Sequence, residues 1–150
     1  ARGATVRVVL DPNKDAFGYE KSGLPNRQVA SELLAASDGA IRVRWYRTHG
    51  EQFHAKVLAV HDARRSWFLV GSANFTRRNL DDYNLEAAIA VETLPGAQPS
   101  AGVQQWFDTL WFNRAAAGIE YTADAETYAD PGQGRYWLYR FMEATGLSTF

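Results

Sequence analysis

The residues best suited to chemistry are a histidine and a lysine two positions apart, His54 and Lys56. On an extended strand, residues two apart point to the same face, so this spacing predicts an imidazole beside an ammonium. A neutral imidazole can attack an anionic phosphate as a nucleophile. The lysine neutralises the phosphate oxygens while charge moves onto the leaving group. The pair therefore predicts phosphoryl chemistry.

Small and polar residues follow this pair after two expected strands, at 56–60 and 67–70, and the turn between them. Gly71 has no Cβ and is expected to let the backbone approach a ligand closely. The Ser72 hydroxyl and the Asn74 amide can donate hydrogen bonds to phosphate oxygens. Arg77 and Arg78 come soon after Asn74, and they form either a basic rim of the site or an ordinary solvated turn.

A carboxylate is available on the strand expected at residues 84–91, where Asn84 and Glu86 share one face. Glu86 would accept a hydrogen bond from one ring nitrogen of His54, fixing the tautomer and raising the basicity of the other nitrogen. This geometry requires the strand at 56–60 to lie beside the strand at 84–91.

Taken together, these residues resemble the signature of the phospholipase D superfamily. The resemblance covers residues 5 to about 115. It is carried by His54-x-Lys56, by Gly71-Ser72 with Asn74 and Phe75-Thr76, and by Asn84-x-Glu86.

The resemblance implies a role for each matching residue. In that family the motif histidine forms a covalent phosphohistidine with the substrate phosphorus, so His54 would be this nucleophile or its acid/base partner. Lys56 and Asn74 would hold the phosphate, and Ser72 would support the phosphate or the histidine. Glu86 would be the acid that hydrogen-bonds the histidine. No metal or other cofactor is implied.

The chain departs from the family pattern in two respects. The family has an aspartate five residues after the motif lysine, where this chain has His61 followed by Asp62. Either Asp62 takes that role through a longer turn, or the role is lost. The family also builds one active site from two HxK motifs, whereas this chain has one. The chain is therefore expected to be the C-terminal half of a two-motif member, or to pair with itself as a twofold homodimer, and to be nearly inactive alone.

Three functions remain open at this point. The first is a phospholipase D or phosphatidyltransferase acting on phospholipids, favoured by 16 basic against 17 acidic residues. Aromatic residues near the C-terminus would then contact either a membrane interface or the core. The second is a nuclease, with a small basic groove. The third is a non-catalytic half-domain that completes a partner. The aromatic residues are Tyr128, Tyr136, Trp137 and Tyr139, and the groove residues are Arg42, Arg44, Arg47, Arg77 and Arg78.

Composition excludes several other classes of protein and of functional site. The 150 residues are 46% hydrophobic and contain no cysteine, which indicates a globular domain and excludes thiol nucleophiles and cysteine zinc sites. Histidine spacing fits no metal motif, and His49 is expected at the surface. No apolar run reaches the ~20 residues of a membrane span. We expect a soluble fragment, cytoplasmic or peripheral to a membrane.

Hydrophobic periodicity predicts an α/β fold in which one mixed sheet is flanked by helices. The family resemblance implies that residues 1–115 are a phospholipase D-like half-domain. A helical extension over 116–150 is expected to pack on the same domain. The first strand, helix and second strand should form a parallel pair. Asn26 should cap the first helix, with Val29, Leu33 and Leu34 on its inner face. Strands are expected at 5–10, 41–46, 56–60, 67–70 and 84–91, helices at 26–37, 103–111 and 135–145, and loops at 13–24, 71–80 and 123–134.

Overall fold

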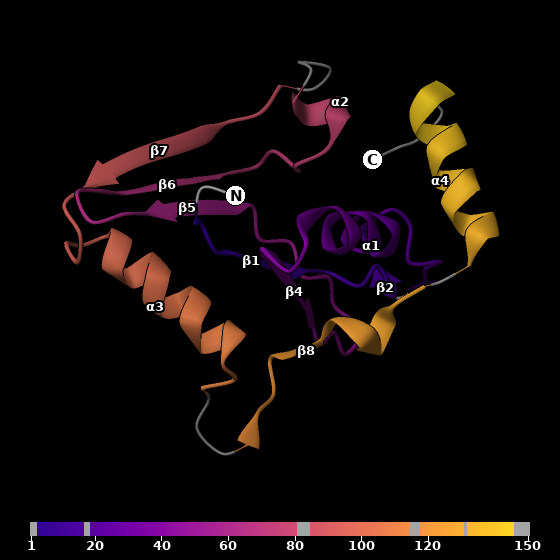
Figure 1. Ribbon diagram of the computed structural model, residues 1–150, viewed down its shortest axis with the longest axis horizontal. Helices are drawn as coiled ribbons and strands as arrows, with labels where there is room; N and C mark the ends of the chain where they lie inside the picture. Colours follow the sequence, from indigo (N-terminus) through magenta and orange to yellow (C-terminus); the bar gives the residue numbers. More distant parts are fainter. Residues whose placement is uncertain (1–2, 17–18, 81–84, 115–117, 131, 146–150) are drawn as a thin grey trace. The chain divides into compact units, whose positions relative to one another are not determined.

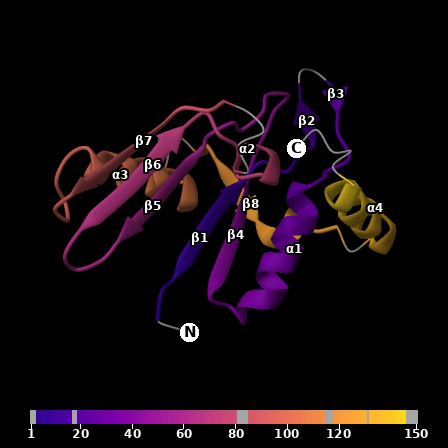
Figure 2. The same ribbon diagram turned by 90° about the horizontal axis from the view of Figure 1, so that it is seen from above.

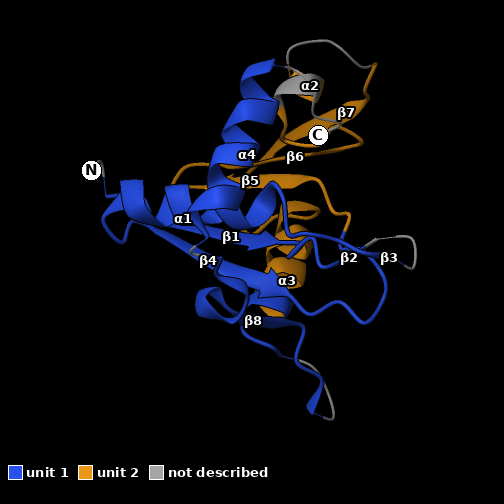
Figure 3. Ribbon diagram, turned by 90° about the vertical axis from the view of Figure 1, so that its right-hand side faces the viewer, with its two compact units in different colours: residues 1–53, 110–149 blue, residues 54–109, 150 orange. Residues whose placement is uncertain are grey.

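The computed structural model describes residues 3–16, 19–80, 85–114, 118–130 and 132–145, without the side chains of residues 16, 77 and 78. The chain divides into two compact units, shown in different colours in Figure 3. The first unit comprises residues 1–53 and 110–149, and the second comprises residues 54–109 with residue 150. One boundary between the units lies between residues 53 and 54, and another lies between residues 109 and 110, inside helix α3 (Ser100–Trp111).

The first unit is built on a mixed sheet with the strand order β1-β4-β8. β1 (Val6–Leu10) and β4 (Ile41–Tyr46) pair in parallel, and helix α1 (Asn26–Ser37) connects them along the chain (Figure 2). The predicted parallel strand–helix–strand unit is therefore confirmed. β8 (Thr122–Asp124) pairs antiparallel with β4. A two-residue hairpin of β2 (Asp15–Ala16) and β3 (Tyr19–Glu20) makes a second small sheet.

Helix α1 begins differently from the sequence expectation. Pro25 is the N-cap residue, and Asn26 is the first helical residue. The predicted Asn26 cap is wrong because the Asn26 side chain donates instead to the carbonyl oxygen of Asp11, at 2.9 Å. Asp38, in the left-handed conformation at φ 47°, ends the helix as predicted.

The buried face of α1 also differs from the predicted one. Gln28 and Ala30 are its buried residues, whereas Leu34 is 36% exposed and Val29 and Leu33 are half-buried. The small Ala30 lets the helix approach the sheet closely, and this close approach sets which side of the helix is covered.

The core of the first unit is centred on Trp45, which is 1% exposed. Trp45 packs with Ala30 and Val43, and its indole nitrogen donates to the Ala125 carbonyl oxygen at 2.7 Å. The Tyr128 ring stands perpendicular to it, with centroids 6.3 Å apart. Residues 123–134, predicted as a loop, therefore contain β8 and the 3-10 helix η2 (Ala125–Tyr128), which close this core.

The C-terminal helix α4 (Gln133–Thr145) contacts α1 within the first unit (Figure 1). It buries Tyr139, while Trp137 and Phe141 remain exposed. Of the aromatic residues near the C-terminus, Tyr139 is thus in the core and Trp137 is not. Among the described residues, no helix has both the length and the apolar character that a membrane crossing needs.

The second unit is an antiparallel sheet in the order β5-β6-β7 (Figure 1). Its strands are β5 (Val57–His61), β6 (Ser66–Gly71) and β7 (Ala88–Thr93), and the one-turn helix α2 (Arg77–Leu80) lies in the loop after β6. The α/β class is confirmed. Within the described residues, the hydrogen-bonded strands group as β1-β4-β8, β2-β3 and β5-β6-β7.

Backbone spacing at the end of β6 requires glycine. A Cβ on Gly71 would lie 2.4 Å from the Ala87 carbonyl oxygen and 2.8 Å from the Ala88 Cα. Both are backbone atoms of the neighbouring strand, so they cannot swing away as a flexible side chain would. Because Gly71 has no side chain, the backbone of Ala87 and Ala88 at the start of β7 can pack against it.

We expect Gly71→Ala to lower the free energy of unfolding by about 1–3 kcal/mol, because the methyl group forces β6 and β7 apart. Chemical denaturation monitored by circular dichroism measures this change. The control is Gly134→Ala in α4, where a Cβ would meet nothing within 4 Å and alanine is the better helix former. Equal stability of Gly71→Ala and the parent chain would contradict the close strand approach.

Candidate active site at one end of the second sheet

Three segments of the second unit meet at one end of its sheet. β5 begins at Val57, β6 ends at Gly71 and β7 begins at Ala88, and the register pairs Val57 with Val70 and Gly71 with Ala88. The N–H of Gly71 donates to the Lys56 carbonyl oxygen at 3.3 Å. The residues just outside the three strands, Lys56, Ser72 and Glu86 among them, are therefore brought to the same sheet end.

His54 and Lys56 lie in the extended segment before β5 rather than within the strand. Lys56 is 9% exposed, whereas His54 is exposed to solvent. The Lys56 Nζ donates to the backbone carbonyl oxygen of His54 at 3.0 Å. The ammonium is thus held beside the histidine through the backbone, and the imidazole stays accessible to a substrate.

Burial changes the acid–base behaviour of Lys56. Removal of water from around the ammonium lowers the pKa of Lys56, and the negative charge of Glu86 opposes this shift. A bound phosphate would compensate for the lost solvation of the ammonium. The reason is that a poorly solvated cation attracts an anion more strongly. Lys56 is therefore suited to hold a phosphoryl group.

Glu86 is held by two neutral side chains. Ser72 Oγ donates to one carboxylate oxygen of Glu86, and Asn79 Nδ2 donates to the other. Ser72 Oγ in turn accepts the N–H of Ala87 at 3.1 Å. The expected hydrogen bond from His54 to Glu86 rested on β5 lying beside β7. That neighbour relation is wrong, because β6 lies between them.

Asn79 is the residue of this network that the sequence reasoning missed. Thr76 Oγ1 donates to Asn79 Oδ1 at 2.9 Å, which turns the amide nitrogen toward Glu86. Thr76 and Asn79 lie at the start of α2, where the N–H of Asn79 also donates to the Thr76 carbonyl oxygen. Thr76 and Asn79 are three residues apart, a spacing similar to that of a helix capping box. This spacing is the sequence signal that could have indicated Asn79.

The remaining predicted site residues divide into two groups. Asn74 is exposed in the loop that follows Ser72, and Gly71 faces the backbone of β7. The side chains of Arg77 and Arg78, and all of Asn84, lie outside the part of the chain that the structure describes. The predicted strand at 84–91 begins at Ala88, so Glu86 precedes it.

The two candidates for the family aspartate lie at the opposite end of β5. The His61 Nδ1 is 3.0 Å from Ser66 Oγ. Asp62 Oδ1 accepts the N–H groups of Arg64 and Arg65, which stabilise the charged carboxylate and lower the pKa of Asp62. Asp62 lies six positions after Lys56 at the other end of β5, a span of roughly 20 Å, and its carboxylate caps the turn after the strand.

The described residues contain no cluster of three histidine, aspartate or glutamate side chains placed to hold a metal ion. His49 is exposed as predicted, with its ring 3.8 Å from the Glu51 carboxylate. The groups that the sheet end assembles are thus one imidazole, one ammonium, one carboxylate, and neutral hydroxyl and amide groups. These can bind and attack a phosphodiester without further ligands.

Comparison with known proteins agrees with this chemistry. The sequence matches the family model described as cardiolipin synthase, PLD-like domain, over residues 1–111 of 150. The match includes every candidate residue of the sheet end. No curated protein matches the chain.

The lowered pKa of Lys56 has a measurable effect on stability. The unfolded chain holds the lysine proton more tightly than the folded chain, so stability rises as the pH approaches the ordinary lysine pKa of about 10.4. We expect Lys56→Met to gain stability relative to the parent chain at about pH 7, and this gain to shrink by about pH 10. Denaturation at both pH values measures it.

A matched control is Lys21→Met, which changes an exposed lysine and should alter the free energy of unfolding by less than ~0.5 kcal/mol. A stability difference for Lys56→Met that stays constant across this pH interval would contradict the buried state of the ammonium.

Proposed function

The chain belongs to the cardiolipin synthase family of PLD-like domains, and on this basis we propose that it acts on phospholipids through a phosphohistidine formed at His54. The family match supports the phosphodiesterase and phosphatidyltransferase class of chemistry of the phospholipase D superfamily. The observation that carries the finer proposal is the buried Lys56, whose Nζ lies 3.0 Å from the carbonyl oxygen of an exposed His54.

The proposed reaction has two displacement steps at phosphorus. In the first, a ring nitrogen of His54 attacks the phosphorus, and the bond from phosphorus to the leaving oxygen breaks. The departing alkoxide takes that electron pair and receives a proton. In the second step, water or an alcohol attacks the phosphorus and gives its proton to the group that protonated the leaving oxygen, and the phosphorus–nitrogen bond breaks, which returns its electron pair to the imidazole. Lys56 and Asn74 hold the phosphoryl oxygens during both steps.

Ser72 and Glu86 have a supporting role in this proposal. Their mutual hydrogen bond fixes the carboxylate at the sheet end, where its charge acts on Lys56. That interaction opposes the lowering of the Lys56 pKa by burial and so favours the protonated ammonium. A protonated Lys56 can stabilise the charge that builds on the phosphoryl oxygens, whereas a neutral amine cannot.

The proton for the leaving group must come from a second acid, and the chain has one HxK pair. We therefore infer that this chain supplies one half of the active site. The other half is a half-domain with a second HxK motif or a second copy of the chain related by a twofold axis. The second histidine would protonate the leaving oxygen while His54 attacks.

A phospholipid is favoured over a nucleic acid because two of the five arginines of the expected basic groove are paired with carboxylates. Arg44 pairs with Asp124 at 2.7 Å, and Arg47 pairs with Glu120 at 2.9 Å. The formal net charge of the chain is −1, whereas nucleic-acid binding draws on unpaired cations that contact phosphates.

The direct test uses the full chain, alone and mixed with a chain that carries the complementary motif. Vesicles of phosphatidylglycerol or phosphatidylcholine are the substrates, and released head group, phosphatidic acid and cardiolipin are measured. We expect turnover that His54→Ala lowers by about 10³-fold or more, because the covalent route is lost. His49→Ala, a change at an exposed histidine outside the sheet end, should retain full activity.

Two other outcomes would each replace the proposal. Cleavage of DNA with a steep dependence on salt, and no lipid turnover, would identify a nuclease. Stable binding of the complementary half, with every phosphodiester left intact, would identify a non-catalytic half-domain.

The covalent intermediate gives an independent prediction. Rapid quenching during lipid turnover, followed by peptide mass spectrometry, should find the mass of a phosphatidyl group on the peptide that contains His54. His54→Ala should lose the adduct. Turnover without any adduct, or an adduct on another residue, would reject His54 as the nucleophile.

A further inference from the structure

A buried carboxylate holds the backbone of the residue that precedes His54. Phe53 donates its N–H to Asp11 Oδ2 at 2.6 Å, and Asp11 is 5% exposed. The other oxygen, Asp11 Oδ1, accepts the N–H of Asn13 at 2.6 Å. A carboxylate whose two oxygens both accept N–H groups makes stronger hydrogen bonds than a neutral acceptor does. The chain that leads into His54 is therefore held at a defined point.

Aromatic stacking holds the same residue through its side chain. The rings of Phe53 and Tyr46 are stacked, with centroids 4.5 Å apart and an angle of 10° between their planes. Tyr46 is the last residue of β4, so the ring of Phe53 rests on the end of a strand. Both the backbone and the side chain of Phe53 thus have fixed partners in the first unit.

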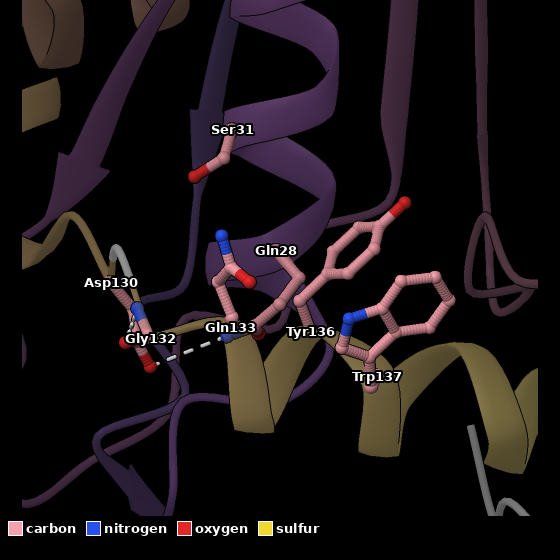
Figure 4. A pocket seen from close by; sticks show the side chains of 7 residues that line it. All are labelled: Gln28, Ser31, Asp130, Gly132, Gln133, Tyr136 and Trp137. Atoms are coloured by element: carbon pink, nitrogen blue, oxygen red, sulfur yellow. Dashed lines mark hydrogen bonds between the residues drawn. The ribbon is translucent and has the colours of Figure 1, made fainter.

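Asp11 is itself placed by regular elements. It directly follows β1, and its carbonyl oxygen accepts from the side chain of Asn26, the first residue of α1, at 2.9 Å. The same helix is fixed by Gln28, which is 2% exposed and donates to Asp130 Oδ2 at 3.3 Å (Figure 4). A group supported by strands and helices is placed more precisely than a group on an unsupported loop.

The backbone is also held on the other side of His54. Its carbonyl oxygen accepts from Lys56 Nζ at 3.0 Å. Each contact lies inside its own unit, and the peptide bond between Phe53 and His54 joins the two contacts. The exposed imidazole therefore keeps little freedom beyond its own side-chain rotations. A nucleophile that is already ordered needs less ordering when the substrate binds, which lowers the barrier to attack.

We propose that Asp11 is a positioning residue for His54. It holds the N–H of Phe53, so that the imidazole meets the phosphorus in a narrow range of positions. This inference rests on the proposed function, in which His54 attacks the phosphorus. Asp11 acts through the backbone of Phe53.

The kinetic test uses Asp11→Asn and Asp11→Ala, each as the full chain mixed with the chain that carries the complementary motif. Asparagine keeps one acceptor oxygen for the two N–H groups, whereas alanine keeps none. We expect kcat for lipid turnover to fall about tenfold in Asp11→Asn and about 10²-fold in Asp11→Ala, because a displaced nucleophile attacks more slowly. KM should stay within about twofold, since Lys56 and Asn74 are unchanged. If Asp11→Ala does not fold, Asp11→Asn decides the test.

Hydrogen exchange measured by NMR separates positioning from a purely structural role. The amide of Phe53 reports the contact with Asp11, and the amide of Trp45, which is 1% exposed, reports opening of the core of the first unit. In Asp11→Asn we expect exchange at Phe53 to accelerate about tenfold more than exchange at Trp45. Equal acceleration at both amides would make Asp11 an ordinary part of the core and overturn the proposal.

The matched control is Asn13→Gly, in the same turn as Asp11. It removes the bond from Asn13 Nδ2 to the Leu24 carbonyl oxygen at 2.7 Å, keeps the N–H that Asp11 accepts, and suits the positive φ of 46°. This control should leave kcat and exchange at Phe53 unchanged. An equal loss of kcat in Asn13→Gly would assign the effect to the whole turn and reject the proposal.

Two further outcomes distinguish this proposal from the proposed function. Selective exchange at Phe53 with an unchanged kcat in Asp11→Asn would reject the positioning role and leave the proposed function intact. A parent mixture without any lipid turnover would reject the proposed function and the catalytic role of Asp11 together. The exchange ratio of Phe53 to Trp45 would still test the contact between Asp11 and Phe53.

Discussion

The close approach of β6 and β7 at Gly71 is the constraint on which the candidate active site depends. Gly71 has room for no side chain, because the Ala87 carbonyl oxygen and Ala88 Cα occupy that space. The same approach lets the Ser72 N–H donate to the Ala87 carbonyl oxygen at 3.0 Å. Ser72 and Glu86 therefore meet because of backbone packing, and the position of the carboxylate follows from the strand register.

The electrostatics of the site follow from that placement. Lys56 is buried and loses solvation, and Glu86 supplies a compensating charge without being tied to the histidine. Ser72 and Asn79 hold the carboxylate through neutral donors. The Glu86 charge thus favours the protonated form of Lys56 against the effect of burial. His54, two residues earlier in the chain, is exposed to solvent.

The first unit obtains its stability by different means. Trp45 is enclosed by α1 on one side and by η2, which follows β8, on the other, and its indole nitrogen is satisfied by the Ala125 carbonyl oxygen. The segment after residue 111, where the family match ends, thus completes the core of this unit. The segment outside the family match therefore contributes to the core packing of the first unit.

The sequence by itself determined the local elements and the chemistry of the motif. Periodicity located β1, α1 and β4 closely, because apolar alternation and turn residues act over short distances in the chain. The residue types of His54, Lys56 and Ser72 were sufficient to indicate phosphoryl chemistry, and the family match agrees. Short elements such as β8 were missed, because three residues carry too little periodicity.

Only the tertiary structure decided which groups meet. The strand order β5-β6-β7 pairs Glu86 with Ser72 and Asn79, and that order depends on contacts between distant segments rather than on local pattern. The burial of Lys56 was equally invisible in the sequence, since a lysine is usually exposed. The hydrogen bond from Phe53 to Asp11 also depends on the fold, because the two residues lie 42 positions apart in the chain.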